Sequence, residues 1–411
     1  MSYPQFASLA QLRERLEEQS FDRPPAIVAN AHITGVSVAR ALAVHDVPVI
    51  ALDRVGNGVA PPSEAVVAAG KVTFPLDDPD GFREDIESVT DVLAHEPVAF
   101  PCMDEWVHAF AETEPDAVRL PFAERDVIAD ILDKESLYAT AEALGVPYPE
   151  TYRLSEIDPD DAADRLGFPL VVKPARKREF EELLGTNVVE VADREEFREV
   201  VVEAQDAGVR VVAQEKVPVA LGEDRSFASY VSPDGDVTSV VGNARVRYPQ
   251  GYGSSCVVDR VEDPELVARA RSVLEDSGYH GISEAEFVYD SDREEYVLLD
   301  VNTRPWKWIS MPVETGSNLP YAAYADAVGL EYDPDENRDA RWLSLPDYLS
   351  LLARSPSFPD VLSTDEWTAL LSGDFESSRG LTTGVYRPSD PGPALQALET
   401  EFGDPDYYCS C

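Results

Sequence analysis

Hydrophobic and polar residues alternate in two runs between residues 281 and 302, and a short polar stretch from Asp290 to Arg293 separates the runs. Alternation of this kind predicts β-strands, and turn-forming residues between the strands predict an antiparallel hairpin. Because side chains alternate with period two, one face of the hairpin should be apolar and directed to the core. That face is expected to carry Ala285, Phe287, Tyr289, Val297, Leu299 and Val301.

The second face of this hairpin carries side chains with oxygen ligands. With the turn centred on Arg293, Glu286 faces Asp300 and Glu284 faces Asn302. Facing Cβ atoms lie roughly 4.5–5.5 Å apart, so like charges in these positions repel each other. A divalent cation between them removes the repulsion, and Mg²⁺ accepts hard oxygen ligands. The pattern therefore indicates a metal site, and a solvated acidic face is the alternative.

The remainder of the chain alternates between strand-like and helical patterns, which predicts an α/β fold. A short amphipathic helix at 6–19 comes first. Asp104 and Glu105 follow a predicted strand at 98–102, at the edge where open α/β sheets hold their ligands. First-turn acids that complement a helix dipole are the alternative. Further strands are expected at 26–29, 47–52, 170–174, 187–191 and 209–214, and helices at 35–45, 105–114, 134–144, 193–207, 345–354 and 364–371.

The composition is strongly acidic, because 78 Asp and Glu residues against 34 Lys and Arg give a net charge of −44. Such self-repulsion is screened in molar salt, where the Debye length is about 3 Å. This composition resembles that of haloarchaeal cytoplasmic proteins. The acids are spread along the chain and aromatic residues make up 9%, which argues against an acidic nucleic-acid mimic or a disordered tail. Without a signal pattern or a long apolar run, a cytoplasmic protein is expected.

Only six of the 34 basic residues are lysines. In a chain that avoids surface lysine, those that remain are candidate phosphate ligands, since lysine binds phosphate as a compact point charge. Lys134 begins a predicted helix, and Lys173 ends an apolar strand just before the basic loop that contains Lys177. Lys307 adjoins the acidic hairpin.

Several separated motifs together resemble the ATP-grasp superfamily over roughly residues 24–330. The motifs are Lys134 at a helix start, Lys173 at a strand end, 214–218 (QEKVP), Glu286-Phe287 and 300–304 (DVNTR). The stretch 245–249 (RVRYP) and Arg304-Pro305-Trp306 are similar to carboxylate–amine ligases of the D-aspartate ligase and carbamoyl-phosphate-synthase-like kind.

This resemblance implies a pre-ATP-grasp Rossmann-like domain followed by two α+β subdomains that clasp ATP. The implied divisions are an N-terminal helix at 1–23, the pre-grasp domain at 24–120, subdomains at 121–213 and 214–330, and a C-terminal helical extension at 331–411. It also implies that Mg²⁺, with Mn²⁺ as the alternative, is held by Glu286, Asp300 and Asn302. The implied ATP ligands are Lys134, Lys173 and Lys177, the backbone of Glu215, Lys216 and Val217 for the adenine, and either Glu223 or Asp224 for the ribose.

Two positions depart from the superfamily pattern. Asp stands at position 300, where Glu is more common, and the loop after Lys173 is basic where many members have a glycine-rich flap. Arg176, Lys177 and Arg178 are the expected substitutes over the γ-phosphate, and an ordinary surface loop is the alternative.

The resemblance implies a ligase that joins a small-molecule carboxylate to an amine through an acyl phosphate. Arg245, Arg247 and Arg304 are expected to bind the substrate carboxylate or the acyl phosphate, since a guanidinium matches both; packed, ion-paired arginines are the alternative. Neither nucleic acid nor membrane is expected as a partner, and a homodimer is left open. The competing functions are a nucleotide-binding sensor or scaffold without turnover and a carboxylase that forms carboxyphosphate.

Overall fold

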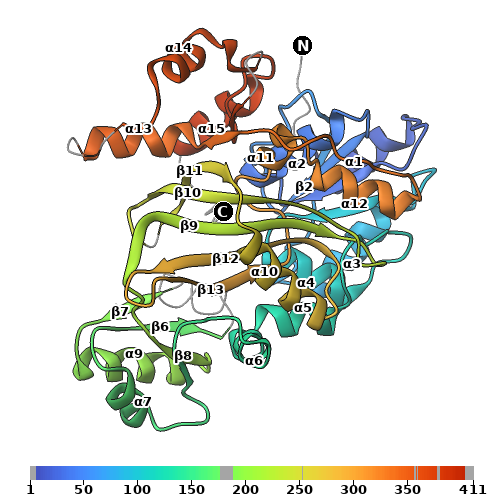
Figure 1. The fold of residues 1–411 in the computed structure, drawn as a ribbon. Coiled ribbons are helices and arrows are strands. Elements are labelled where there is room, and N and C mark those ends of the chain that lie inside the picture. Colours follow the sequence, from blue (N-terminus) through green and yellow to red (C-terminus); the bar gives the residue numbers. More distant parts are fainter. Residues whose placement is uncertain are drawn as a thin grey trace.

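The computed structural model describes residues 6–175, 188–251, 253–355, 358, 360–376 and 380–402. These residues form three sheets with helices packed around them (Figure 1). The first sheet has four parallel strands in the order β3-β2-β1-β4. Its elements are β1 (Ala26–Ala29), β2 (Val49–Asp53), β3 (Val66–Lys71), β4 (Val98–Pro101), α1 (Leu9–Glu17), α2 (Ile33–Ala43), α3 (Pro79–Thr90) and α4 (Asp104–Thr113).

The second sheet forms a separate lobe that lies below the central strands in Figure 1. Its four strands follow the order β5-β8-β6-β7 and all pair antiparallel. Helices α5 (Arg125–Leu132) and α6 (Lys134–Leu144) connect the first sheet to this lobe. The lobe consists of β5 (Thr151–Arg153), α7 (Pro159–Leu166), β6 (Leu170–Pro174), β7 (Val189–Val191), α9 (Arg194–Asp206) and β8 (Val211–Glu215).

The third sheet has seven strands in the order β13-β12-β9-β10-β11-β14-β15 and crosses the centre of the molecule. Its strands are β9 (Val219–Val231), β10 (Val237–Tyr248), β11 (Ser254–Val261), β12 (Gly281–Asp290), β13 (Glu295–Asn302), β14 (Arg341–Leu343) and β15 (Leu381–Thr383). The helices around it are α10 (Pro264–Asp276), α11 (Ser310–Thr315), α12 (Leu319–Val328), α13 (Leu345–Arg354), α14 (Thr364–Ser372) and α15 (Gly392–Phe402).

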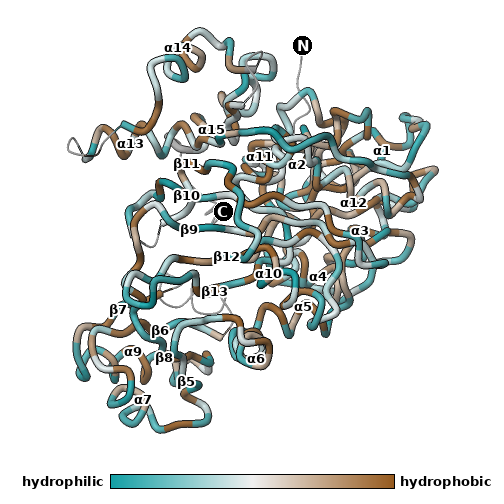
Figure 2. The backbone as a smooth tube through the Cα atoms, in the orientation of Figure 1, coloured by the Kyte–Doolittle hydropathy of each residue, from teal (hydrophilic) through white to brown (hydrophobic). Residues whose placement is uncertain are grey.

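Hydrophobic clusters cover both faces of the seven-stranded sheet. One face, which includes Phe287 and Leu298, packs with residues of α5, α6 and α10. The other, which includes Ala228 and Ile282, packs with residues of α2, α11 and α12. Hydrophobic and hydrophilic segments are interspersed along the whole backbone (Figure 2). This mixed α/β architecture confirms the predicted fold class.

The central hairpin keeps the predicted register only at the end away from its turn. Glu286 pairs with Asp300 and Glu284 with Asn302, as expected. A β-bulge then shifts the register, so that Phe287 pairs with Leu298. Leu298 is buried in the core instead of Leu299, and Val297 pairs with Val288 instead of Tyr289. The prediction of Leu299 as a core-facing residue was wrong, because a bulge inserts an extra residue that alternation alone does not reveal. Val297 is buried, as expected, but it lies on the opposite face of the hairpin from Phe287.

The C-terminal segment was expected to be helical, and α13 and α14 match the predicted helices. It also contributes β14 and β15, which extend the seven-stranded sheet beyond β11. These strands have three residues each, too few for a period-two pattern to stand out in the sequence. The segment is therefore part of the central sheet in addition to carrying helices.

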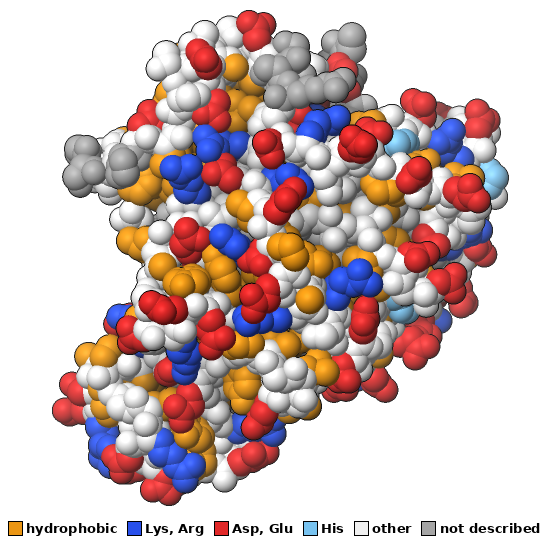
Figure 3. Space-filling model, viewed as in Figure 1, with side chains coloured by type: hydrophobic (Ala, Val, Ile, Leu, Met, Phe, Trp, Pro, Cys, Tyr) orange, Lys and Arg blue, Asp and Glu red, His pale blue; other side chains and the backbone are white. Residues whose placement is uncertain are grey.

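Acidic side chains are scattered over the visible face and do not gather in one patch (Figure 3). Among the described residues, no helix combines the length and the apolar character that a membrane crossing requires.

Candidate functional site

Four side chains on the polar face of the β12–β13 hairpin form what we call the carboxylate cluster: Glu284, Glu286, Asp300 and Asn302. The amide Nδ2 of Asn302 donates to Glu286 Oε1 at 2.7 Å and to Glu284 Oε2 at 3.1 Å. Glu284, Asp300 and Asn302 are at least nine-tenths buried. Burial and the neighbouring charge of Glu286 raise the pKa of Glu284 well above its ordinary value. The hairpin thus concentrates negative charge in a poorly hydrated place.

A lysine from helix α6 reaches this cluster. Lys134 Nζ lies 3.0 Å from Asp300 Oδ1, and both side chains are nearly buried. The position of Lys134 follows from its place at the first turn of α6, where Asp133 caps the helix. The backbone N–H of Lys134 also donates to the carbonyl of Ala175 at 3.5 Å, just beyond β6. Lys173 is on β6, two residues before Ala175, whereas Lys177, Arg176 and Arg178 lie outside the described residues.

Strands β9 and β10 add an arginine and an aspartate to the same face. Arg247 Nε lies 2.6 Å from Asp224 Oδ2, and its Nη2 lies 3.6 Å from Glu286 Oε2. Register shifts in β10 between residues 244 and 247 precede this arginine. Glu223, the alternative to Asp224, instead accepts a hydrogen bond from the hydroxyl of Tyr296 at 2.9 Å and approaches Arg225. Strand alternation sends adjacent residues to opposite faces, so only Asp224 joins the site.

The first domain contributes Asp104, which begins α4 directly after β4. Its Oδ1 lies 2.6 Å from Nε of Arg304, whose Nη1 donates to the carbonyl of Pro305 at 3.0 Å. Arg304 is buried, and the negative charge of Glu284 favours the charged form of its guanidinium. Asp104 and Glu105 lie in the first turn of α4, as the helix-dipole alternative expected, and Asp104 also holds the guanidinium of Arg304.

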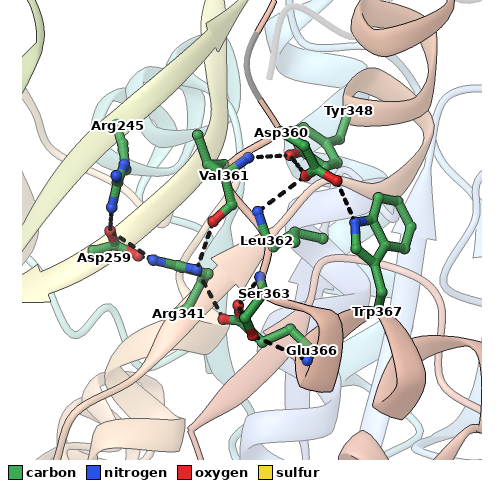
Figure 4. A network of polar contacts seen from close by, with 10 residues as sticks. All are labelled: Arg245, Asp259, Arg341, Tyr348, Asp360, Val361, Leu362, Ser363, Glu366 and Trp367. Carbon is green, nitrogen blue, oxygen red and sulfur yellow. Dashed lines mark hydrogen bonds and ion pairs between the residues drawn. The ribbon is translucent and has the colours of Figure 1, made fainter.

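Arg245 is not brought to the cluster. Its guanidinium lies 3.6 Å from Asp259 and is half-exposed. Asp259 in turn belongs to a group of polar contacts that we call the C-terminal network (Figure 4). It consists of Arg245, Asp259, Arg341, Tyr348, Asp360, Val361, Leu362, Ser363, Glu366 and Trp367.

The predicted adenine segment connects β8 of the second sheet to β9 of the third. The side chain of Glu215 lies 2.6 Å from Arg293 and accepts from the backbone of Glu150, so it ties this connection to its surroundings. Lys216 Nζ lies 2.6 Å from Glu190 Oε1 on the lobe, and both side chains are partly exposed. Val217 accepts a hydrogen bond from the backbone N–H of Val219. None of these contacts places the three residues at the carboxylate cluster.

Sequence reasoning did not identify the two polar partners of Lys307, Ser254 and Asp347. Lys307 Nζ lies 2.6 Å from Asp347 Oδ2 and 2.9 Å from Ser254 Oγ. The scarcity of lysine had drawn attention to Lys307 without giving it a role. Nothing in the local sequence around Asp347 indicates that α13 lies next to Lys307.

The donor set of the hairpin suits a hard cation. No group of three His, Cys, Asp or Glu side chains that could hold a metal ion occurs among the described residues. Mg²⁺ does not need one, because it keeps several waters and is usually bound by one or two carboxylates together with substrate phosphates. Glu286 and Asp300, with Asn302 beside them, meet that requirement and have a lysine within reach.

Several curated proteins that are similar in sequence to this chain are ligases by name. No family model matches the chain. A D-alanine–D-alanine ligase of Pseudomonas fluorescens is 26% identical over 232 residues, which are 52% of this chain and 64% of the relative. The corresponding enzyme of Ectopseudomonas mendocina is 31% identical over 227 residues, 52% of this chain and 66% of the relative. A D-aspartate ligase of Enterococcus faecium is 23% identical over 252 residues, 56% of this chain and 59% of the relative. The chain spans slightly less than two thirds of the length of these relatives.

Solved structures match over a longer part of the chain. N5-carboxyaminoimidazole synthetase from Staphylococcus aureus, in complex with ADP, superposes with a TM-score of 0.64 at 14% identity. The superposition covers 82% of this chain and 87% of the synthetase chain. An L-amino acid ligase from Bacillus licheniformis has a TM-score of 0.57 at 15% identity, over 77% of this chain and 76% of its own. At such identities the likeness establishes the fold.

Proposed function

The chain has the ATP-grasp fold, and on this premise we propose that it is an ATP- and Mg²⁺-dependent carboxylate–amine ligase. In the proposed reaction a substrate carboxylate oxygen attacks the γ-phosphorus of ATP, and the bond to ADP breaks. The amine nitrogen of the second substrate then attacks the acyl carbon. Phosphate leaves, the nitrogen loses a proton, and an amide remains.

The contact between Lys134 and Asp300 is the observation that carries this proposal. A predicted phosphate ligand on α6 and a predicted metal ligand on β13 lie far apart in the sequence and meet at 3.0 Å in a nearly buried place. A protein with a net charge of −44 repels a nucleotide triphosphate unless local cations receive it. Lys134 supplies such a cation next to oxygen ligands that suit Mg²⁺.

The residues then divide into three roles. Glu286, Asp300 and Asn302 would hold Mg²⁺, which when bound neutralises the charge that develops on the phosphate oxygens. Arg247 and Arg304 would hold the substrate carboxylate and its phosphorylated form, since a guanidinium presents a matching fork. The remaining proposed contacts are to ATP: Lys134 and Lys173 to its phosphates, residues 215–217 to adenine and Asp224 to the ribose.

Catalysis in such a site consists mainly of positioning and electrostatic stabilisation. The buried pairs Arg304–Asp104 and Arg247–Asp224 fix the two guanidinium groups before substrate arrives. No nucleophilic side chain is required for the proposed steps.

A screen of ADP release tests this function. Purified protein in high-potassium buffer with Mg–ATP receives single amino acids, other carboxylates and amines, and then pairs of them. We expect ADP release that depends on one acid and one amine together, with the amide as a product detected by mass spectrometry. Release that depends on bicarbonate would indicate the carboxylase instead. Binding of Mg–ATP without turnover across the panel would indicate a sensor or scaffold.

The D-amino acids deserve a place in the panel because of the relatives. The names of the similar proteins, D-alanine–D-alanine ligase and D-aspartate ligase, specify D-amino acids as what those proteins join. For this chain we propose an amino acid as one substrate on that basis.

A further inference from the structure

A hollow of about 550 Å³ lies along the outer edge of the second sheet. Strand β5 is an edge strand of that sheet, helix α6 forms one wall of the hollow, and α7 with the segment before it forms the other. Small-molecule sites usually have volumes of about 300–1,000 Å³. The lining contains none of the four residues of the carboxylate cluster. We call this hollow the edge groove, and its lining includes Glu135, Tyr138, Glu142, Tyr148, Tyr152 and Arg165.

Tyrosine rings supply the aromatic surface of the edge groove. The ring of Tyr148 stacks on that of Tyr138, with centroids 5.2 Å apart and planes inclined by 14°. Tyr138 is buried, whereas Tyr148 and Tyr152 are partly exposed. The guanidinium of Arg165 lies over the ring of Tyr152, 5.4 Å from its centroid. Because the face of an aromatic ring attracts cations, this contact shows that a cation is accommodated in the groove.

The charges that line the edge groove favour a cation over an anion. The lining contains three glutamates, Glu135, Glu142 and Glu156, and two arginines, Arg153 and Arg165. Arg153 is already engaged within the groove, since its Nη1 lies 3.2 Å from Glu156 and its Nη2 donates to the carbonyl of Glu135 at 2.6 Å. Arg165 is held over a tyrosine ring. The acids are therefore in excess, and neither arginine is available as a simple anion site.

Glu135 is the acid of the edge groove that lacks full charge compensation. Its side chain is 13% exposed, and Nη1 of Arg210 lies 3.3 Å from it. Burial and the neighbouring charge of Asp133 nevertheless raise the pKa of Glu135 above its ordinary value. A bound cation next to Glu135 would offset both effects.

The edge groove is connected to the proposed nucleotide site by hydrogen bonds. The hydroxyl of Tyr138 donates at 2.9 Å to the backbone carbonyl of the residue before Asp300. Gln214 Nε2 donates to the same hydroxyl at 3.1 Å and to Oγ1 of Thr151, another lining residue, at 2.8 Å. Helix α6 itself begins at Lys134, which contacts Asp300. The wall of the groove thus carries a proposed phosphate ligand and touches the strand of a proposed metal ligand.

We propose that the edge groove is a second ligand site that takes a small organic cation with an ammonium or guanidinium group, and that this cation tightens nucleotide binding. The cation lies against the carboxylates of Glu135 and Glu142 and the exposed ring faces of Tyr148 and Tyr152, and so holds α6 against β5. A helix that is ordered in advance loses less conformational entropy when the nucleotide binds. The cation site does not depend on the proposed function, and only its effect on the nucleotide does.

A matched series of probes tests the cation site. Butylguanidinium, butylammonium and butyrate share one alkyl chain and differ in the charged group. Calorimetric titration without nucleotide, at an ionic strength held constant with KCl, gives affinity and stoichiometry for the wild type, Glu135→Gln and Tyr148→Leu. The control is Glu262→Gln, which removes the same charge from a side chain that is 78% exposed and outside the groove. This control is needed because a net charge of −44 attracts every cation.

We expect both cations to bind the wild type and Glu262→Gln alike at one equivalent, and butyrate not to bind. Glu135→Gln should weaken cation binding about tenfold, and Tyr148→Leu about 2- to 5-fold. Equal weakening in Glu135→Gln and Glu262→Gln, or binding without a defined stoichiometry, would mean general attraction to an acidic protein and would overturn the site. Should either groove variant not fold, Glu142→Gln, at an exposed position of α6, takes its place with an expected 2- to 5-fold loss.

The effect on the nucleotide is measured as the Kd of Mg–ADP with and without saturating butylguanidinium. We expect the cation to tighten Mg–ADP binding about 5-fold, and Mg–ADP to tighten cation binding by the same factor, since coupling between two sites is reciprocal. An unchanged Kd would contradict the coupling and leave the cation site. A protein that binds the cation but not Mg–ADP would contradict the proposed ligase and not the edge groove.

Discussion

Two polar groups of this molecule, the carboxylate cluster and the C-terminal network, use the same residue types in opposite ways. In the network each acid has donors around it: Asp259 receives Arg341 at 2.5 Å and Arg245 at 3.6 Å, and Glu366 receives Arg341 at 2.8 Å. In the cluster acids lie next to acids, and Glu284 and Glu286 share one amide donor from Asn302.

The pKa shifts of one acid from each group, Glu284 and Asp360, have opposite directions. Burial and the charge of Glu286 raise the pKa of Glu284. Burial alone would also raise the pKa of Asp360, but hydrogen bonds from Tyr348, Trp367 and Leu362 outweigh it and lower that pKa. An arrangement selected for stability pairs its charges, whereas one that must receive a cation keeps them close and under-compensated. The difference supports the proposal that the carboxylate cluster, and not the C-terminal network, performs the chemistry.

The largest effect is expected from Asp300→Asn. The change removes a proposed Mg²⁺ ligand and the partner of Lys134, so turnover should fall by about 10²–10³-fold, the range typical for losing one group that stabilises the transition state. The melting temperature should change little, because the substitution also removes a negative charge that repels the neighbouring acids of the cluster. Steady-state ADP release and thermal melting together measure this.

Asp339→Asn is the matched control for that experiment, since the Asp339 side chain is 99% exposed. It should leave turnover at the wild-type level. Full activity in Asp300→Asn would contradict the assignment of Asp300, and equal loss in both variants would show that the effect is not local.

Arg341→Met should have the opposite profile. It removes the two-pronged contact with Asp259 and the contact with Glu366, and it leaves partly buried acids without their main donor. We expect the free energy of unfolding to fall by about 2–3 kcal/mol. Nucleotide affinity should stay unchanged, because these residues do not contact the carboxylate cluster. Chemical denaturation and Mg–ADP binding measure the two quantities. Arg125→Met, at an exposed pair with Glu112, is the control.

The hairpin shows how far the sequence could predict this comparison. Period-two alternation with one turn residue was enough to pair Glu286 with Asp300 and Glu284 with Asn302. The bulge that follows depends on how the two strands twist and pack, so the predicted burial of Leu299 failed. Likewise, the irregular register of β10 sends Arg245 and Arg247 to different partners, although they are two residues apart.

Long-range pairing accounts for what the sequence could not predict. Lys134 could be recognised as a candidate from its helix start, because capping is a local property. The contact of Asp347 with Lys307 depends on the pairing of β14 with β11, which comes much earlier in the chain. Three-residue strands carry no pattern of their own, so their partners, and the residues that they bring with them, appear only in the folded structure.

The response to pH sharpens the comparison. With its pKa raised on folding, Glu284 binds a proton more tightly in the native than in the unfolded protein, so metal-free protein should lose stability as the pH rises above about 4.5. The loss amounts to about 1.4 kcal/mol for each pH unit between the unfolded and the folded pKa. Glu284→Gln should remove this part of the slope, because glutamine does not titrate. Its amide oxygen can still accept from Asn302. Melting in EDTA from pH 5 to 8 measures it, with the exposed Glu262→Gln as control. An unchanged slope would show that Glu284 titrates normally.

Asp360→Asn should give the smallest effect, with the reverse dependence on pH. Trp367 Nε1 and the N–H of Leu362 donate to this carboxylate at 2.6 and 3.0 Å, and the hydroxyl of Tyr348 donates to it as well. Because Asp360 is exposed, solvent screens these bonds, and the loss should be about 1 kcal/mol or less. Because folding lowers the pKa of Asp360, its contribution to stability is present above the pKa of the unfolded state. That contribution is lost as the pH falls through the pKa of the folded state. The difference in melting temperature between wild type and Asp360→Asn should therefore be largest near neutral pH and shrink on acidification. A difference that grows in acid would mean that Asp360, like Glu284, is held closer to its protonated form, and the contrast between the two groups would not hold.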